Sequence, residues 1–200
     1  MTRMPTPLER IYKTDDADAQ RTAYDDWAQR YEADLAAGGY ATPHRLAKMV
    51  ARFAHVPGPV LDFGCGTGLA GAALAAEGLG PIDGVDMSEG MMARARERGL
   101  YRSLILSDPA APHRPSGYPI TVACGAISPG AAPASLLAPL AGSVPDGGLL
   151  VFSFNDLALK EETYRAALDG LDAMLTPLCA EHGPHLPAHG LMSTIYAYRK

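Results

Sequence analysis

Alternate glycines in one short segment create a place where a nucleotide-like ligand could bind. The segment Val60–Gly68 reads VLDFGCGTG, an apolar run followed by glycine at every second position. Glycine lets the backbone turn sharply and approach a ligand with no side chain between them. The helix expected next would add unpaired N–H groups and the positive end of its dipole. We therefore predict a ligand-binding loop around Gly64, Gly66 and Gly68.

Two classes of adenosine cofactor compete for this loop. Residues 66–71 also match GxGxxG, the pattern of loops that bind the pyrophosphate of nicotinamide dinucleotides. However, Asp62 immediately before the glycines would repel a pyrophosphate, whereas it could pair with an ammonium group. The glycine pattern also begins at Gly64, two residues before the dinucleotide match. Both features favour an adenosine that carries an amino acid, S-adenosylmethionine.

Further polar residues follow the next apolar runs. Asp86 lies 22 residues after Gly64, where a carboxylate can accept both ribose hydroxyls of either cofactor class. Met87 could lie against the adenine, and Asp108 could accept from the adenine amino group. Because the carboxyl ends of parallel strands meet at one sheet edge, we expect these residues to line one site.

The elements that must position these residues alternate between short apolar runs and amphipathic segments. Helices are predicted over Gln20–Ala37 and from the N-cap Thr42 onward, and the near-continuous apolar runs between later helices indicate a mostly parallel sheet covered on both faces. The segment Pro177–Gly190 is left unassigned. The predicted strands are Val60–Phe63, Ile82–Val85, Leu104–Leu106, Ile120–Cys124, Leu149–Phe154 and Leu191–Tyr198.

Six segments carry a resemblance to a known family. They are residues 24–28 with Tyr31, 61–68, 84–88, 125–128, 147–149 and 195–200. On these residues the chain resembles the class I S-adenosylmethionine-dependent methyltransferases, and among them the small methyltransferase-like family typified by the Williams–Beuren syndrome region methyltransferase. The resemblance implies an α/β, three-layer Rossmann-like fold with a mostly parallel seven-stranded sheet and an antiparallel last strand. We expect one domain over 1–200, with N-terminal helices in 1–57 as a lid and a cofactor-binding core in 58–200.

The resemblance also implies roles for individual residues. Asp62 and the glycines would face the methionine part, and Asp86 would hold the ribose. Tyr24 and Tyr31, seven residues apart, would close over the cofactor or else pack in the core. Pro109 lacks an N–H donor to adenine, so Ser107 or a later residue would take its place. The predicted cofactor-binding residues are Tyr24, Tyr31, Asp62, Gly64, Cys65, Gly66, Gly68, Asp86, Met87, Ser107, Asp108 and Cys124.

No catalytic residue is assigned. The side chains expected nearest the methyl acceptor are Cys124, Ser128, Asn155 and Asp156, which could equally be ordinary polar strand ends. A group of histidines, His182, His185 and His189 with Glu181, lacks the helical spacing of a zinc site, so no metal is predicted. The segment is interpreted either as a loop that lines the acceptor pocket or as plain surface. Three widely spaced cysteines indicate free thiols.

Composition and charge indicate which classes of binding partner are expected. With 17 Lys and Arg against 22 Asp and Glu, the net charge is −5 and no basic stripe favours nucleic acid. No apolar run suits a membrane span, and the polar segment Met1–Asp18 is unlike a secretory signal, so a cytoplasmic location is expected. The favoured function is methyl transfer from S-adenosylmethionine to a small molecule, yielding S-adenosylhomocysteine. A nicotinamide-dependent oxidoreductase and a non-catalytic module that binds S-adenosylmethionine or S-adenosylhomocysteine remain alternatives, and the oligomeric state is open.

Overall fold

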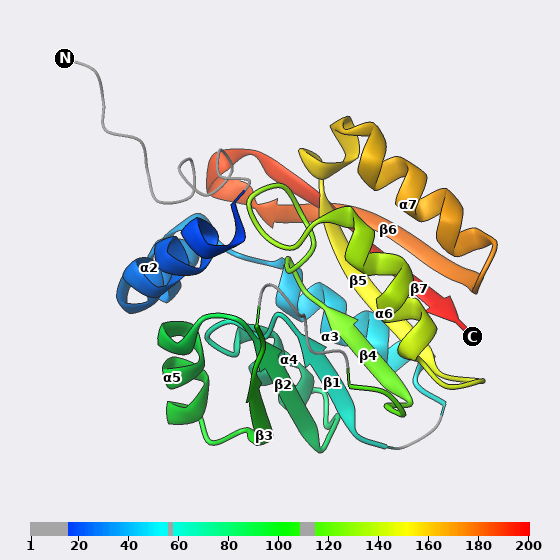
Figure 1. Cartoon of the computed structure of the whole chain (residues 1–200), viewed down its shortest axis with the longest axis horizontal. Helices are drawn as coiled ribbons and strands as arrows, with labels where there is room; N and C mark the ends of the chain where they lie inside the picture. Colours follow the sequence, from blue (N-terminus) through cyan, green and yellow to red (C-terminus); the bar gives the residue numbers. More distant parts are fainter. Residues whose placement is uncertain (1–15, 56–57, 109–114) are drawn as a thin grey trace.

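A twisted seven-stranded sheet forms the middle layer of the computed structural model, which describes residues 16–55, 58–108 and 115–200 (Figure 1). The strand order is β3-β2-β1-β4-β5-β7-β6, and β7 runs antiparallel to both of its neighbours. The predicted mostly parallel sheet with an antiparallel last strand is therefore confirmed. The strands are β1 Val60–Phe63, β2 Ile82–Asp86, β3 Tyr101–Leu106, β4 Ile120–Ala123, β5 Leu149–Asn155, β6 Thr176–Leu186 and β7 Leu191–Arg199.

Helices cover both faces of the sheet. Asp16 caps the first of them by accepting the Ala19 N–H, and Ser88 caps α5 by accepting the Met91 N–H. The helices are α2 Ala17–Gly38, α3 Thr42–Phe53, α4 Leu69–Ala76, α5 Glu89–Glu97, α6 Leu137–Ser143 and α7 Glu162–Asp172, with 3-10 turns η1 Ala134–Leu136, η2 Ala158–Lys160 and η3 Pro187–His189. None of the helices in the described part of the chain is long and apolar enough to cross a membrane.

Alternation along the strands divides the core into two apolar layers. Successive strand residues point to opposite faces of a sheet, so Leu149 and Val151 of β5 pack with α3 and α4, whereas Leu150 and Phe152 pack with α6 and α7 (Figure 1). Ser153 lies two residues after Val151, so its side chain points to the same face, the one covered by α3, at the carboxyl end of the strand. The same alternation places Asp62 of β1 on the α3 and α4 face.

The predicted lid over 1–57 divides into two different structures. Leu46 and Val50 of α3 are fully buried in the core layer, so α3 is a structural helix of the sheet. The long helix α2 lies apart from that layer, beyond the carboxyl end of the parallel strands (Figure 1). Residues 1–15 and 56–57 lie outside the described residues. Of the described residues in this segment, those of α2 are therefore the ones placed to cover a site at this edge.

Two local predictions needed correction, and the structure places one segment that was left unassigned. Thr42 is the first residue of α3 rather than its N-cap, and its hydroxyl bonds to β6 and β7 residues instead of the helix backbone. Strand β3 begins at Tyr101, not Leu104. The unassigned segment Pro177–Gly190 contains most of β6, an edge strand whose one partner among the described strands is β7, with register shifts beside Pro177 and Pro184. Proline is tolerated in such a strand because one of its sides needs no ladder hydrogen bonds.

Candidate cofactor and acceptor site

A cavity of about 510 Å³ lies at the carboxyl ends of the parallel strands, between them and α2. Its volume is within the range of small-molecule sites. Residues of α2, the glycine loop, the ends of β2 and β3, and loop 125–133 line it. It brings together nine of the twelve predicted cofactor residues, namely Tyr24, Tyr31, Gly64, Gly66, Asp86, Met87, Ser107, Asp108 and Cys124. Asp62, Cys65 and Gly68 are not part of the lining.

The glycine loop needs glycine for two different reasons. Gly64, Gly66 and Gly68 all have positive φ, at 70°, 53° and 86°, which side chains other than glycine rarely adopt. A Cβ on Gly64 would lie 2.4 Å from the Cβ of Ala126, so this glycine allows loop 125–133 to approach. A Cβ on Gly66 would meet nothing within 4 Å. The backbone at Gly66 is therefore open toward the cavity.

Asp86 connects this loop to the start of α5. Its Oδ2 accepts the N–H of Gly66 at 2.8 Å, and its Oδ1 accepts the N–H of Ser88 at 2.9 Å. Burial raises the pKa of this carboxyl, and the backbone hydrogen bonds oppose that rise. Each carboxylate oxygen has a second lone pair, and Asp86 lines the cavity. The side chain is thus built to accept two further hydroxyl hydrogen bonds from a ligand.

Asp62 lies behind the loop rather than in the cavity. Its side chain is 0% exposed, its Oδ2 accepts the Tyr101 hydroxyl at 2.7 Å, and burial raises its pKa to about 7. Among the described residues, Asp62 Oδ1 and Thr67 Oγ1 are the two buried side-chain polar atoms without a hydrogen-bond partner. Both belong to the segment that precedes α4, so unsatisfied polarity is concentrated at this loop.

Tyr101 is a residue of the site that sequence reasoning missed. A Cβ on Gly71 would lie 2.3 Å from the Tyr101 hydroxyl, and one on Gly84 would lie 3.0 Å from its ring. The last glycine of the GxGxxG match therefore makes room for Tyr101, which holds Asp62. The sequence signal was the pair Gly71 and Gly84 before an aromatic residue, Tyr101, at the start of the next strand. That the glycines lie against Tyr101 depends on how the strands pair, which the sequence does not give.

The cysteines near the site are protonated thiols. Burial raises the pKa of Cys65 well above its usual range and that of Cys124 to about 12. Cys65 is buried beside Gly84, and Cys124 lies 3.8 Å from the Tyr40 hydroxyl. Because the thiolate is the nucleophilic form, these residues act as small packing groups.

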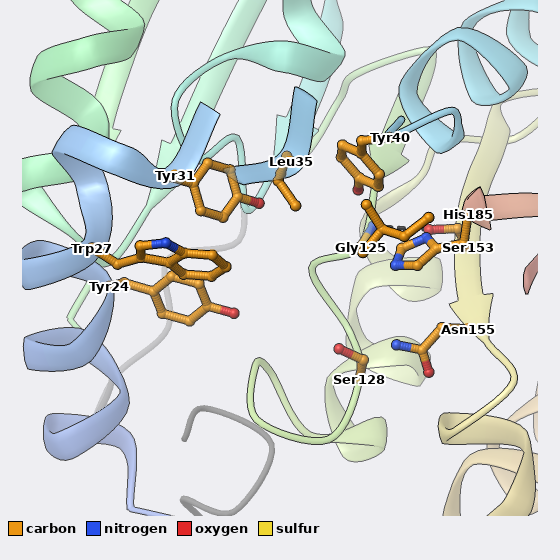
Figure 2. A pocket seen from close by; sticks show the side chains of 11 residues that line it. Tyr24, Trp27, Tyr31, Leu35, Tyr40, Gly125, Ser128, Ser153, Asn155 and His185 are labelled. Carbon is orange, nitrogen blue, oxygen red and sulfur yellow. Dashed lines mark hydrogen bonds between the residues drawn. The ribbon is translucent and has the colours of Figure 1, made fainter. Parts of the chain in front are cut away.

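A smaller chamber of about 50 Å³ adjoins the main cavity and shares Tyr24, Tyr31, Gly125 and Ser128 with it. Figure 2 shows the aromatic rings of α2 on one side and Ser153, Asn155 and His185 on the other. Trp27 packs edge-on against Tyr31 with ring centroids 4.7 Å apart, and its Nε1–H donates to Asp34 Oδ2 at 2.7 Å. The rings of α2 are thus both packed and exposed to the cavities.

The residues predicted to lie near the acceptor are separated by the structure. Cys124 lines the main cavity, Ser128 lines both spaces and Asn155 lines the chamber. Asp156 lines neither, because its Oδ1 pairs with His182 Nε2 at 3.1 Å on the surface. Of the histidines considered for a metal, only His185 lines a cavity, and no group of three metal-ligating side chains occurs in the ranges that the structure describes.

Two contacts tie α2 to the cofactor side of the sheet. Asp25 Oδ1 accepts the Ser88 hydroxyl at 2.5 Å and the Gly90 N–H at 2.9 Å. Arg98 pairs with Glu32 at 2.8 Å and donates from Nε to the Thr67 carbonyl at 2.7 Å. The helix that bears Tyr24 and Tyr31 is therefore anchored to the elements that carry Asp86 and the glycine loop.

Comparison with known proteins gives consistent results. The model of a family described as a methyltransferase domain matches residues 60–125. Human methyltransferase-like protein 27 is 36% identical over 160 residues, which cover 74% of this chain and 64% of that protein's length, just under two thirds.

Solved structures share the fold at low sequence identity. A TehB-like SAM-dependent methyltransferase from Corynebacterium glutamicum superposes with a TM-score of 0.63 at 19% identity, covering 90% of this chain and 98% of that one. Magnesium protoporphyrin IX methyltransferase from Synechocystis, with bound SAM, gives 0.63 at 18% identity, covering 97% and 89%. In its glycine loop, its sheet order and these comparisons, the chain is similar to the class I S-adenosylmethionine-dependent methyltransferases.

Proposed function

We propose that this protein transfers a methyl group from S-adenosylmethionine to a small-molecule acceptor. The observation that carries the proposal is the pairing of an open glycine backbone at Gly66 with the Asp86 carboxylate in one cavity of about 510 Å³. Gly66 can approach the amino-acid part of the cofactor, and Asp86 can accept from the ribose hydroxyls. Met87, Ser107 and Asp108 would surround the adenine.

The residues of the site would act mainly by positioning. When bound, S-adenosylmethionine supplies a methyl group on a sulfonium, and transfer forms a bond from the acceptor atom to the methyl carbon as the carbon–sulfur bond breaks. Holding two reactants in line supplies much of the rate effect in such a reaction. Tyr24 and Tyr31 would cover the cofactor, and loop 125–133 would hold the acceptor. With Cys124 protonated, no thiolate competes for the methyl group.

The two alternatives differ in what they require. A dinucleotide-binding oxidoreductase typically has the all-parallel strand order 3-2-1-4-5-6, whereas here an antiparallel β7 lies between β5 and β6. That difference disfavours nicotinamide. A non-catalytic binding module would use the same cofactor cavity, and only turnover separates it from an enzyme.

Calorimetric titration with S-adenosylmethionine, S-adenosylhomocysteine and NADH tests the cofactor. We expect both sulfur compounds to bind and Asp86→Asn to weaken each by about tenfold or more, because hydrogen bonds to a charged group contribute about 1.5–3 kcal/mol. Asp146→Asn, the same change at an exposed turn before β5, should bind like wild type. NADH binding without S-adenosylhomocysteine binding would sink the proposal.

Turnover is tested by measuring S-adenosylhomocysteine formed from S-adenosylmethionine with panels of small carboxylic acids, phenols and amines. Product formation that depends on one added compound would identify an enzyme. Binding without turnover by any panel would favour the non-catalytic module.

A further inference from the structure

The small chamber beside the cofactor cavity has a lining without charged side chains. Its walls are aromatic rings of α2 and neutral polar groups of β5, β6 and loop 125–133 (Figure 2). A volume of about 50 Å³ is a few times the space that one water needs. The chamber therefore suits a compact polar group of a molecule whose remainder lies in the main cavity.

A hydrogen-bond relay behind the chamber determines which nitrogen of His185 carries the proton. Ser193 is fully buried, and its Oγ accepts from Arg45 Nη1 at 3.1 Å. Among the described residues, Thr42 Oγ1, at 3.1 Å, is the one acceptor within reach of the Ser193 hydroxyl proton. The Thr42 proton must in turn go to His185 Nδ1, at 2.8 Å. Since Nδ1 accepts, a neutral His185 carries its proton on Nε2.

His185 stays neutral over the physiological range. Its side chain is 7% exposed, and burial, with the nearby Arg45 on α3, lowers its pKa to about 4, while Asp156 at the end of β5 opposes that shift. The ring of Tyr40 packs edge-on against it with centroids 5.2 Å apart. The Nε2–H is consequently a neutral donor of fixed orientation.

Ser153 supplies a second donor on the same wall. The Ser153 Oγ accepts the Gly125 N–H at 2.8 Å, and none of the described residues accepts the hydroxyl proton of Ser153. In Figure 2, Ser153 and His185 lie next to each other, across the chamber from Tyr31 and Trp27. Two neutral donors thus meet an otherwise uncharged space.

We propose that Ser153 and His185 bind a carboxylate or carbonyl oxygen of the methyl acceptor and so determine which small molecules are positioned for transfer. The inference rests on the proposed function and names the substrate class: a compact molecule that bears a hydrogen-bond-accepting oxygen. A cationic ammonium group has donors only, so it could not accept a hydrogen bond from Ser153 or His185. His185 is a positioning residue, and it removes no proton from the acceptor.

The test uses the full chain with ¹⁵N-labelled histidine, saturated with S-adenosylhomocysteine so that probes cannot occupy the cofactor site. Long-range ¹H–¹⁵N spectra at pH 7 should show His185 protonated at Nε2 and not at Nδ1. Benzoate and benzamide should shift the His185 Nε2 signal, whereas benzylamine should leave it unchanged. An Nδ1–H tautomer, equal shifts with benzylamine, or no shift with either oxygen probe would overturn the proposal.

Variants add an affinity measurement. His185→Gln should weaken benzoate binding by about fivefold, as expected for one hydrogen bond, while leaving the affinity for S-adenosylhomocysteine within twofold. His182→Gln, a change on the same strand outside both cavities, should bind benzoate like wild type. The tautomer is read from the wild-type spectrum without any variant or S-adenosylhomocysteine. Failure to bind S-adenosylhomocysteine would therefore count against the methyltransferase proposal, while an Nδ1–H tautomer would overturn the role given to His185 whether or not that compound binds.

Discussion

The Asp62 and Tyr101 pair is the residue-scale feature with the clearest energetic consequence. A fully buried carboxyl has one oxygen on a phenol and the other without a partner, and its pKa is raised to about 7. The folded state therefore holds a proton that the unfolded state releases near pH 4. This contribution to stability is complete below about pH 3.8 and is lost as the pH rises through about 7.

Removing the phenol hydroxyl makes the ionised carboxyl more costly. Tyr101→Phe should lower the free energy of unfolding by about 1–3 kcal/mol at pH 8, the cost of a buried group that loses its partner. The loss should be smaller at pH 5, where Asp62 is protonated. Urea unfolding at the two pH values measures the difference.

Tyr118→Phe is the matched control, because Tyr118 also donates to an aspartate, Asp83. Arg102 also bonds to Asp83, and these bonds lower the pKa of that carboxyl. The control should therefore lose the same stability at pH 5 and pH 8. Equal losses for Tyr101→Phe at both values would refute the role assigned to the pair.

At the scale of elements, the contacts of Asp25 with Ser88 and Gly90 attach α2, which bears Tyr24 and Tyr31, to the start of α5. Ser88, which lies just after the end of β2, makes three hydrogen bonds here. Its Oγ donates to Asp25 and accepts the Met91 N–H, and its own N–H donates to Asp86. A change in the position of α2 would thus move Tyr24 and Tyr31 relative to Asp86.

Asp25→Ala should loosen α2. We expect amide hydrogen exchange across Ala17–Gly38 to quicken about fivefold and S-adenosylhomocysteine affinity to fall by a similar factor, because an ion–dipole contact at an exposed position contributes about 1 kcal/mol. Asp26→Ala changes the adjacent exposed aspartate and should have neither effect. Unchanged exchange in Asp25→Ala would show that packing alone holds the helix.

For the whole molecule, Asp62 and His185 give opposite dependences of stability on pH. The lowered pKa of His185, about 4, means that its contribution is complete above pH 6.5 and is lost as the pH falls toward 4. The contribution of Asp62 to the free energy of unfolding instead falls as the pH rises from about 4 to 7. Each has a slope near 1.4 kcal/mol per pH unit, so the two largely cancel between pH 4 and 6.5.

Single variants separate the two contributions. Relative to wild type, Asp62→Asn should make the unfolding free energy rise with pH between 4 and 6.5, and His185→Gln should make it fall. Urea unfolding at half-unit pH intervals provides the difference curves, in which the other titrating groups cancel. Parallel curves for wild type and both variants would contradict the assignment.

The sequence predicted best where the signal is local. Strand β1 and the glycine loop follow from an apolar run and alternate glycines, and Asp86 follows from its spacing along the chain. Strand β6 was missed because an edge strand with prolines has no apolar alternation, and it forms only when β7 offers a partner. Tyr101 was missed because its hydrogen-bond partner, Asp62, lies 39 residues away.

The chain's own pattern determined the parallel half of the sheet and the loop at its edge, because strand periodicity and glycine backbone freedom are properties of neighbouring residues. Tertiary structure alone decided that Asp62 lies behind the loop and that His185 faces a chamber. Both outcomes depend on contacts between strands and helices far apart in sequence, where burial and hydrogen bonding set a side chain's protonation and direction.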